Sequence, residues 1–442
     1  MNQPTPTWAV APFVLYLLLI AMLPLLVGQF WEKNRNKLLV AGLLSTPVVF
    51  YLFRVRVGGG ALLLQTGSDY VSFIALLGAL FTISGGICLR GSLVGKPIVN
   101  TACLVLGSVL GSLIGTTGAS VLLIRPLLRA NQHRASTTHI VVFFIFIVSN
   151  GAGLLTPLGD PPLFLGFLRG VPFAWTLRLA APWALVNGTL LVLFAAIDSV
   201  LYRLERRRPA RPASPPTDAA EPLRLDGGLN FLWLFAIVGV VFTIGTFGTR
   251  AFGDGFVRSL VQIVATLALA AISFVTTSRR VHEGNRFNWA PIVEVAVVFV
   301  GVFVTMIPAL SYLEERGASL GITQPWQFFW ASGALSSVLD NAPTYLTFAS
   351  LASGVVDAGR AGLGTANLGA LSADPVGQHL LSAVSCGSVF MGAMTYIGNG
   401  PNFMVKAIAE QHHVRMPGFF AYIVWSGTIL GPIFLVVSRV FF

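Results

Sequence analysis

Two aspartates stand out because each interrupts an apolar stretch of the chain. Asp160 follows Pro157-Leu158-Gly159 and precedes two prolines, and Asp340 begins the sequence Asp-Asn-Ala-Pro-Thr. An ionisable group at membrane depth is costly and is therefore a functional candidate. Desolvation raises the proton affinity of a carboxylate whereas a bound cation lowers it, so one carboxylate can exchange a cation for a proton. We predict that Asp160 and Asp340 bind Na⁺ and protons in turn.

Hydroxyl and amide side chains lie near both aspartates in the sequence. Such oxygens, together with carbonyls freed where a helix is broken, are ligands that a hard alkali cation accepts. A structural role stays open, because an aspartate before proline also favours the start of a helix. We expect no resident cofactor, only transported Na⁺ and H⁺. The further candidate ligands are Thr116, Thr117, Asn150, Thr156, Asn341, Thr344, Thr395, Asn399 and Asn402.

The composition predicts an all-α protein that crosses a membrane many times. Only 10% of the 442 residues are charged, 55% are hydrophobic, and the mean hydropathy is +0.78, whereas soluble domains carry about 25% charged residues. A net charge of +11 would suggest nucleic acid as the partner of a soluble protein. In a membrane protein the position of the basic residues reports topology instead, so we expect the lipid bilayer and a small ion as partners, and no nucleic acid.

Ten apolar segments are long enough to cross about 30 Å of hydrocarbon. Two further stretches, 98–130 and 325–356, have polar centres that contain glycine or proline, and we predict that they form re-entrant helical hairpins, although one of them could be two ordinary short helices. Five crossings then fall on each side of an Arg- and Pro-rich stretch. The ten segments are 8–28, 37–53, 70–89, 138–168, 174–202, 229–248, 256–277, 290–310, 378–411 and 417–441.

An odd number of crossings inverts the second half relative to the first. We therefore divide the chain into a first repeat (1–202), a linker (203–228) and a second repeat (229–442). Placing the linker in the cytoplasm puts 19 of the 28 lysines and arginines inside, as the positive-inside rule requires. The prediction is a multi-pass protein of the bacterial inner membrane with both termini outside.

The two halves share a sequence element. Residues 156–164 (TPLGDPPLF) align with 395–403 (TYIGNGPNF) at a constant offset, and residues 116–120 of the first hairpin align with 340–344 of the second. Each element breaks an apolar span, which we place at 138–168 and 378–411. Two inverted copies of such a unit are typical of a secondary transporter whose site lies between the repeats.

We predict structural rather than transport roles for the remaining polar residues of the spans. Asp198 ends a span, so we interpret it as interfacial. The histidines lie at span ends or in loops, and we predict no proton carrier among them. They are His133, His139, His282, His379, His412 and His413.

Three motifs give the chain a family resemblance: SVLDNAPT (337–344), SNGAGLLTPLGDPP (149–162) and TYIGNGPNF (395–403). On the basis of these motifs, the chain resembles the ion transporter superfamily, in particular NhaD-type sodium/proton antiporters and citrate transporters of the CitMHS type. The resemblance implies a homodimer, with a scaffold part in each half and an elevator-like transport part that contains both hairpins and both broken helices.

Within that superfamily we predict a sodium/proton antiporter. Transport of citrate, a dicarboxylate or arsenite is the alternative. Dicarboxylate members resemble one another in a Ser-Asn-Thr at both hairpin tips, which this chain lacks, and no lysine or arginine lies at either break to offset an anion. Helix N-termini could still hold one. An intramembrane aspartyl protease is disfavoured because the first glycine of Gly-x-Gly-Asp is missing, and a channel because no filter repeat is visible. We therefore predict a transporter rather than an enzyme.

Overall fold

The computed structural model describes residues 4–90, 94–207, 224–252, 256–285, 287–357 and 368–442. This part of the chain is nearly all helix. The short strands β1 (Cys88–Arg90) and β2 (Arg224–Asp226) pair antiparallel. Within the described residues, nine helices are long and apolar enough to cross a membrane. The predicted class, an all-α polytopic membrane protein, is confirmed.

The first half begins with three long helices, continues with a helix pair and a broken helix, and ends with one long helix. Of the predicted linker, residues 208–223 lie outside the described chain. The helices are α1 (Ala11–Leu26), α2 (Gly28–Trp31), α3 (Asn34–Arg54), α4 (Gly59–Gly85), α5 (Pro97–Ile114), α6 (Thr116–Ala130), α7 (Thr138–Ile147), α8 (Pro161–Leu168) and α9 (Ala180–Arg207).

The second half repeats this order of long helices, helix pair, broken helix and long helix. Whether the two halves are inverted in the membrane, and whether the hairpins are re-entrant, stay predictions. The helices are α10 (Leu229–Phe252), α11 (Phe256–Thr276), α12 (Arg279–Gly284), α13 (Ala290–Arg316), α14 (Pro325–Ser336), α15 (Asn341–Asp357), α16 (Leu368–Ala373), α17 (Pro375–Met391), α18 (Gly400–Gln411) and α19 (Phe419–Phe441).

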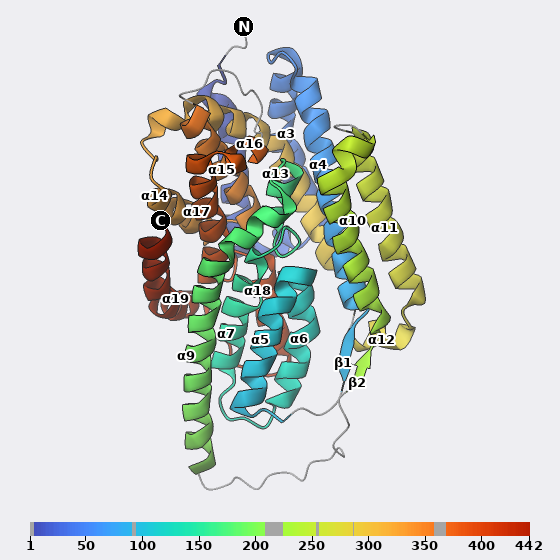
Figure 1. Ribbon diagram of the computed structural model, residues 1–442, viewed down its shortest axis with the longest axis vertical. Coiled ribbons are helices and arrows are strands. Elements are labelled where there is room, and N and C mark those ends of the chain that lie inside the picture. The colour runs from blue at the N-terminus through green and yellow to red at the C-terminus, as the bar shows by residue number, and fades with distance from the viewer. Residues whose placement is uncertain (1–3, 91–93, 208–223, 253–255, 286, 358–367) are drawn as a thin grey trace.

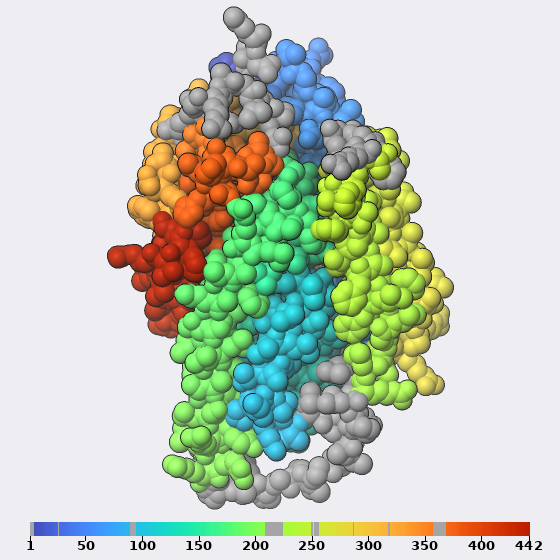
Figure 2. Space-filling model, viewed as in Figure 1, coloured from blue at the N-terminus to red at the C-terminus, as the bar shows by residue number. Residues whose placement is uncertain are grey.

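The helices of the two hairpins occupy opposite ends of the molecule. In Figure 1, α5 and α6 lie in the lower part and α14 to α17 in the upper part, while α4, α10 and α11 form one flank. Helix α4 packs against α10, α11 and α13, and α5 packs against α6 and α9. Figure 2 shows α9 along the surface, with α5 exposed between α9 and α10.

Local sequence explains where the helices break. Gly115, between α5 and α6, has a φ of +82°, a conformation that glycine adopts at little cost. Prolines occupy the first turns of α8 and α18, where their missing N–H costs no hydrogen bond. We call α5–α6 the first hairpin and α14–α15 the second, and we call residues 148–160 and 392–399 the first and second breaks.

Burial separates a protein-facing interior from a lipid-facing exterior. In α7 and the residue after it, each of residues 140–148 is at most 1% exposed, so this helix is enclosed by others. Large apolar side chains such as Leu43, Phe50 and Val275 are exposed, as expected where the surrounding solvent is lipid rather than water. The span predicted from residue 70 begins at Gly59, because apolar character resumes directly after the turn at Gly58. Asp69 therefore lies inside α4.

Candidate ion-binding site

The hairpin tips and the breaks are bonded to each other in both halves. The backbone N–H of Thr116 donates to the carbonyl of Gly159 at 2.9 Å, which fixes the first tip against the first break. The hydroxyl of Thr156 donates to the carbonyl of Ser112, and that of Thr395 donates to the carbonyl of Ser337 at 2.5 Å. These two aligned threonines therefore tie each break to its own hairpin.

Asp160 is the centre of a polar cluster to which both halves contribute. Its side chain accepts hydrogen bonds from Thr116 Oγ1 at 3.2 Å, Asn341 Nδ2 at 2.5 Å and Asn399 Nδ2 at 3.5 Å. Asp160 is only 2% exposed. We call these four residues the Asp160 cluster. Each of the three donors is uncharged, so they orient the carboxylate without neutralising it.

One oxygen of the Asp160 cluster has no partner in the described chain. Oδ1 of Asn341 is buried and accepts no hydrogen bond, although Nδ2 of the same amide contacts Asp160. Buried polar atoms are nearly always hydrogen-bonded, so an exception indicates a function or a missing ligand. A carboxylate and an adjacent free amide oxygen are a suitable pair of ligands for a hard cation.

A chain of asparagine amides continues from the cluster and joins the two breaks. Asn399 Nδ2 also lies 3.2 Å from Asn150 Oδ1, and Asn150 Nδ2 donates to Asn402 Oδ1 at 2.7 Å. Asn402 Nδ2 in turn donates to the carbonyls of Gly392 and Thr395 at 2.8 and 2.9 Å. Asn150 and Asn402 thus provide hydrogen-bond partners for backbone carbonyls of the broken helices and hold the two breaks together. Their side-chain oxygens accept hydrogen bonds and are not free to bind an ion.

Asp340 lies beside the cluster but makes local contacts. Its Oδ1 accepts the backbone N–H of Ala342 at 3.1 Å, and its carbonyl accepts the hydroxyl of Thr344 at 3.0 Å. These contacts cap the start of α15, as the structural interpretation of this residue expects. Asp340 is half-buried, and its carboxylate interacts electrostatically with that of Asp160. Two neighbouring carboxylates disfavour each other's charge unless a proton or a cation lies between them.

A pocket opens on one side of the cluster. Its polar lining comes from the first hairpin tip and the first break, and includes Thr116, Thr117 and Asp160. The opposite wall is an apolar face of α4 with Phe73, Leu80 and their neighbours. Among the described residues that line the pocket, Asp160 alone carries a charge. The pocket therefore offers a small ion one carboxylate and several oxygens.

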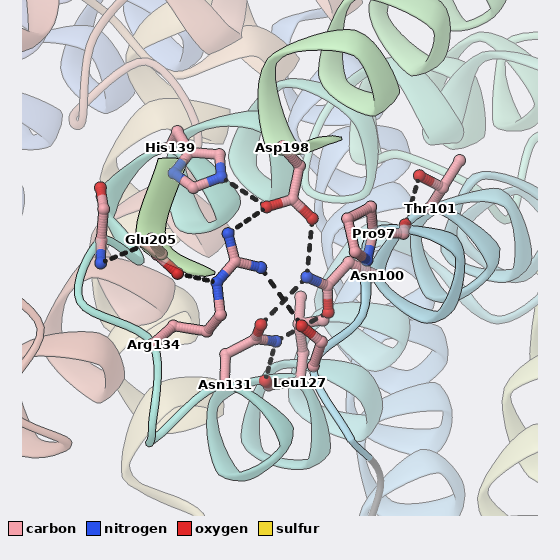
Figure 3. Close-up of polar contacts among 11 residues, drawn as sticks. Pro97, Asn100, Thr101, Leu127, Asn131, Arg134, His139, Asp198 and Glu205 are labelled. Carbon is pink, nitrogen blue, oxygen red and sulfur yellow. Dashed lines mark hydrogen bonds and ion pairs between the residues drawn. The ribbon is translucent and has the colours of Figure 1, made fainter. Parts of the chain in front are cut away.

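A second polar cluster, which the sequence analysis did not identify, lies at the base of the first hairpin (Figure 3). Asp198, which we expected at the interface, is fully buried. It accepts hydrogen bonds from Arg134 Nη2 at 2.8 Å and Asn100 Nδ2 at 2.9 Å, and its Oδ1 lies 2.9 Å from His139 Nε2. We call it the basal cluster. It consists of Asn100, Asn131, Arg134, His139, Asp198 and Glu205.

The basal cluster joins four elements of the first half. Asn100 of α5 and Asn131, directly after α6, exchange amide hydrogen bonds at 3.0 and 2.7 Å, which holds the two hairpin arms together. Arg134 also donates to Glu205 of α9 at 2.7 Å. The sequence signal was available: an aspartate inside an apolar span, with a basic loop predicted on the same side. These residues are far apart in the sequence, so their contact in the fold could not be predicted from it.

A family model with the description "Putative citrate transport" matches residues 2–442. The chain belongs to this family. The resemblance to citrate transporters of the ion transporter superfamily is thereby confirmed, and this citrate-transport family member is a membrane transporter of a small ion or solute. No curated protein matches the chain.

Proposed function

We propose that the protein is a secondary transporter whose Asp160 cluster binds a coupling cation and a proton alternately. The observation that carries this proposal is a carboxylate that is 2% exposed and whose only hydrogen-bond donors within the described residues are the uncharged side chains of Thr116, Asn341 and Asn399. A buried charge without a neutralising partner is costly. Either a proton or a bound cation removes that cost, and exchange between the two couples their gradients.

We propose further that the cargo is a citrate-type carboxylate, because the family match favours it over the antiport that we predicted first. Four helices, α6, α8, α15 and α18, begin at the tips and breaks. The N-terminus of a helix is the positive end of its dipole and attracts anions. A cation on Asp160 would offset part of the negative charge of the cargo, so cation and carboxylate would bind together.

Sodium/proton antiport is the second candidate, and the pocket itself supports it. Asp160 and Asp340 interact with each other, and the pocket lining carries no basic side chain in the described part of the chain. Such a site suits a cation better than a multivalent anion. Arsenite remains a third cargo of the same superfamily.

Transport by the purified protein in liposomes distinguishes these cargoes. Labelled citrate uptake would be measured under Na⁺, Li⁺, K⁺ or H⁺ gradients, and an internal pH dye would report exchange when the same salts are added without citrate. Citrate uptake that depends on a cation gradient and is lost in Asp160→Asn supports the main proposal. A pH change in the absence of citrate supports sodium/proton antiport. Efflux of arsenite supports arsenite as the cargo. If the protein moves none of these, all three cargoes are wrong.

We also propose an elevator-type movement within a homodimer, with both termini outside. The orientation is testable with single cysteines at exposed positions of the described chain. His413→Cys should be protected from an impermeant thiol reagent in intact cells, whereas Ser319→Cys should react. The reverse pattern would overturn the orientation.

A further inference from the structure

An ion pair outside the Asp160 cluster involves a charged residue within a helix long and apolar enough to span a membrane. Asp69 is in α4, which has 27 residues and is therefore about 40 Å long, with Asp69 about 15 Å from its start. Its Oδ2 lies 3.3 Å from Nε of Arg169, directly after α8. The two side chains are 14% and 15% exposed. Intramembrane charges are functional candidates by default, and the transport chemistry above uses neither of these.

The pair lies just beyond one end of the pocket. Asp69, Phe73, Leu76 and Leu80 are three or four residues apart and so share one face of α4. The last three line the pocket, whereas Asp69 does not. On the other side, Pro161 and Phe164 of α8 line the pocket, and Arg169 follows the end of that helix. Along both helices, therefore, the ion pair lies beyond the nearest lining residue: Asp69 is four residues before Phe73 in α4, and Arg169 is five residues after Phe164 of α8.

An aromatic contact lies between the pair and the pocket. The rings of Phe73 and Phe164 stack with their centroids 6.5 Å apart. Phe73 also contacts Phe299 and Phe303 of α13 at 5.2 and 5.8 Å. Both Phe73 and Phe164 line the pocket. Both side chains are buried and apolar, which disfavours water in the space beneath the charges.

The ion pair joins α4 to the end of α8. Helix α4 packs against α3, α6, α10, α11 and α13, whereas α8 packs mainly against α15 and less extensively against α4 and α17. Helix α8 begins directly after Asp160. A displacement of α8 relative to α4 would therefore move the Asp160 cluster and separate Asp69 from Arg169 in the same step.

The geometry of the pair is suited to opening. Oδ2 of Asp69 is buried and makes no hydrogen bond in the described chain, although it is the atom nearest Arg169. The charges attract each other without the alignment of a hydrogen bond. In a buried pair the cost of desolvation offsets much of the Coulomb attraction. Entry of water between the two side chains would therefore separate them at low cost.

We propose that Asp69 and Arg169 form a gate that closes one end of the pocket and opens once in each transport cycle. The ion pair holds α8 against α4, and Phe73 and Phe164 exclude water below it. Opening exposes the Asp160 cluster to the side of the membrane on which Arg169 lies. This inference rests on the proposed function, because a gate of this kind is needed only by a protein that transports.

Thiol labelling tests the gate without requiring a known cargo. Thr117→Cys places a reporter in the pocket lining, in a background in which Cys88, Cys103 and Cys386 are replaced by alanine. Asp69→Asn should increase labelling by an impermeant maleimide at least about tenfold, from the Arg169 side only. Glu283→Asn, at an exposed residue that does not line the pocket, is the control and should leave the rate unchanged. Equal rates with and without Asp69→Asn would overturn the gate.

Cross-linking tests whether opening is required for transport. Asp69→Cys with Arg169→Cys would be joined by a short, reducible bifunctional thiosulfonate. Transport should fall at least about tenfold and return on reduction. The matched control joins the neighbouring residue of α4 to α13 by Tyr70→Cys with Ala296→Cys, at a contact where Tyr70 Oη donates to the backbone carbonyl of Ala296 at 2.8 Å, and should not affect transport. Full transport by the Asp69–Arg169 cross-linked protein would contradict the proposal.

The two experiments separate the gate from the proposed function. If wild-type protein transports no tested solute but Asp69→Asn still speeds labelling of the reporter, the gate stands and the proposed cargo is wrong. If wild-type protein transports and neither the neutral variant nor the cross-link has an effect, Asp69 and Arg169 are a structural pair and the gate is wrong.

Discussion

The two halves of the molecule carry their carboxylates at different positions of the same structural unit. In the first half the break has Asp160 and the hairpin tip has Thr116; in the second half the tip has Asp340 and the break has Asn399. Asp160 receives donors from both halves, whereas Asp340 accepts a backbone N–H of its own helix. The two halves thus play different parts: the first break supplies the buried carboxylate, whereas the second half supplies the amides of Asn341 and Asn399 that orient it.

The largest effect is expected from Asp160→Asn, which removes the shared carboxylate but preserves its size. Cation-coupled transport should fall at least about 100-fold, equivalent to about 2.7 kcal/mol of barrier, because the uncharged amide neither binds a proton nor neutralises a cation. Initial rates in liposomes would measure this. Glu283→Gln, at an exposed residue, should transport normally, and a variant at Asp160 that keeps wild-type coupling would refute the role of this residue.

The double variant Asp160→Asn with Asn399→Asp moves the carboxylate from the first break to the equivalent position of the second break. It tests whether the two halves are interchangeable. We expect no recovery of transport. In the native chain Asn399 Nδ2 lies 3.1 Å from the carbonyl of Ser149 and 3.2 Å from Asn150 Oδ1, so a carboxylate there would meet two acceptor oxygens. Rates as high as wild type in the double variant would show that the halves are interchangeable. The single Asn399→Asp variant is the control.

A smaller effect is expected from Asp340→Asn. Asparagine preserves a cap at the start of α15, so the fold should be retained, while the charge beside Asp160 is lost. Coupled transport should fall roughly tenfold, about 1.4 kcal/mol, and its pH dependence should narrow to the titration of one carboxylate. Rates measured from acid to alkaline pH would test this. A pH profile identical to that of wild type would mean that Asp340 is a cap and nothing more.

The last effects concern stability rather than transport, and they compare one contact from each hairpin region. Asp198→Ala removes the acceptor of Arg134, His139 and Asn100 and should cost about 3 kcal/mol or more, since it leaves Arg134 buried without this partner. Trp330→Phe removes one hydrogen bond from α14 to Ser438 of α19 at 3.0 Å and should cost about 1 kcal/mol. Thermal unfolding midpoints in detergent would rank the two. A larger decrease for Trp330→Phe would contradict the assignment of the basal cluster as the stronger anchor.

Local sequence predicted the features that depend on local chemistry. Glycine and proline at positions 115, 161 and 400 mark the helix interruptions, and apolar length marks the long helices. The alignment of residues 156–164 with 395–403 predicted that Asp160 and Asn399 occupy equivalent places, and the structure puts them within 3.5 Å. Broken backbone in a membrane must lie beside polar groups, and here each break supplies polar side chains to the other.

Features that depend on contacts between distant segments could not be read from the sequence. Asp198 was interpreted as interfacial because its position at the end of a span shows nothing of Arg134 or His139, which surround it. Asp69 was overlooked because α4 begins at Gly59, eleven residues before the predicted span. In both cases the charged group pairs with a residue that is distant in the sequence. The pattern of neighbouring residues does not indicate such a partner.

Binding of radiolabelled Na⁺ to the purified protein tests the central claim, that Asp160 takes up a cation in exchange for a proton. The wild-type protein should bind Na⁺ saturably, with an affinity that weakens as the pH falls, and Asp160→Asn should abolish the binding while Asn399→Asp with Asp160→Asn does not restore it. Na⁺ binding that is absent from the wild type, independent of pH, or unchanged in Asp160→Asn would contradict the claim.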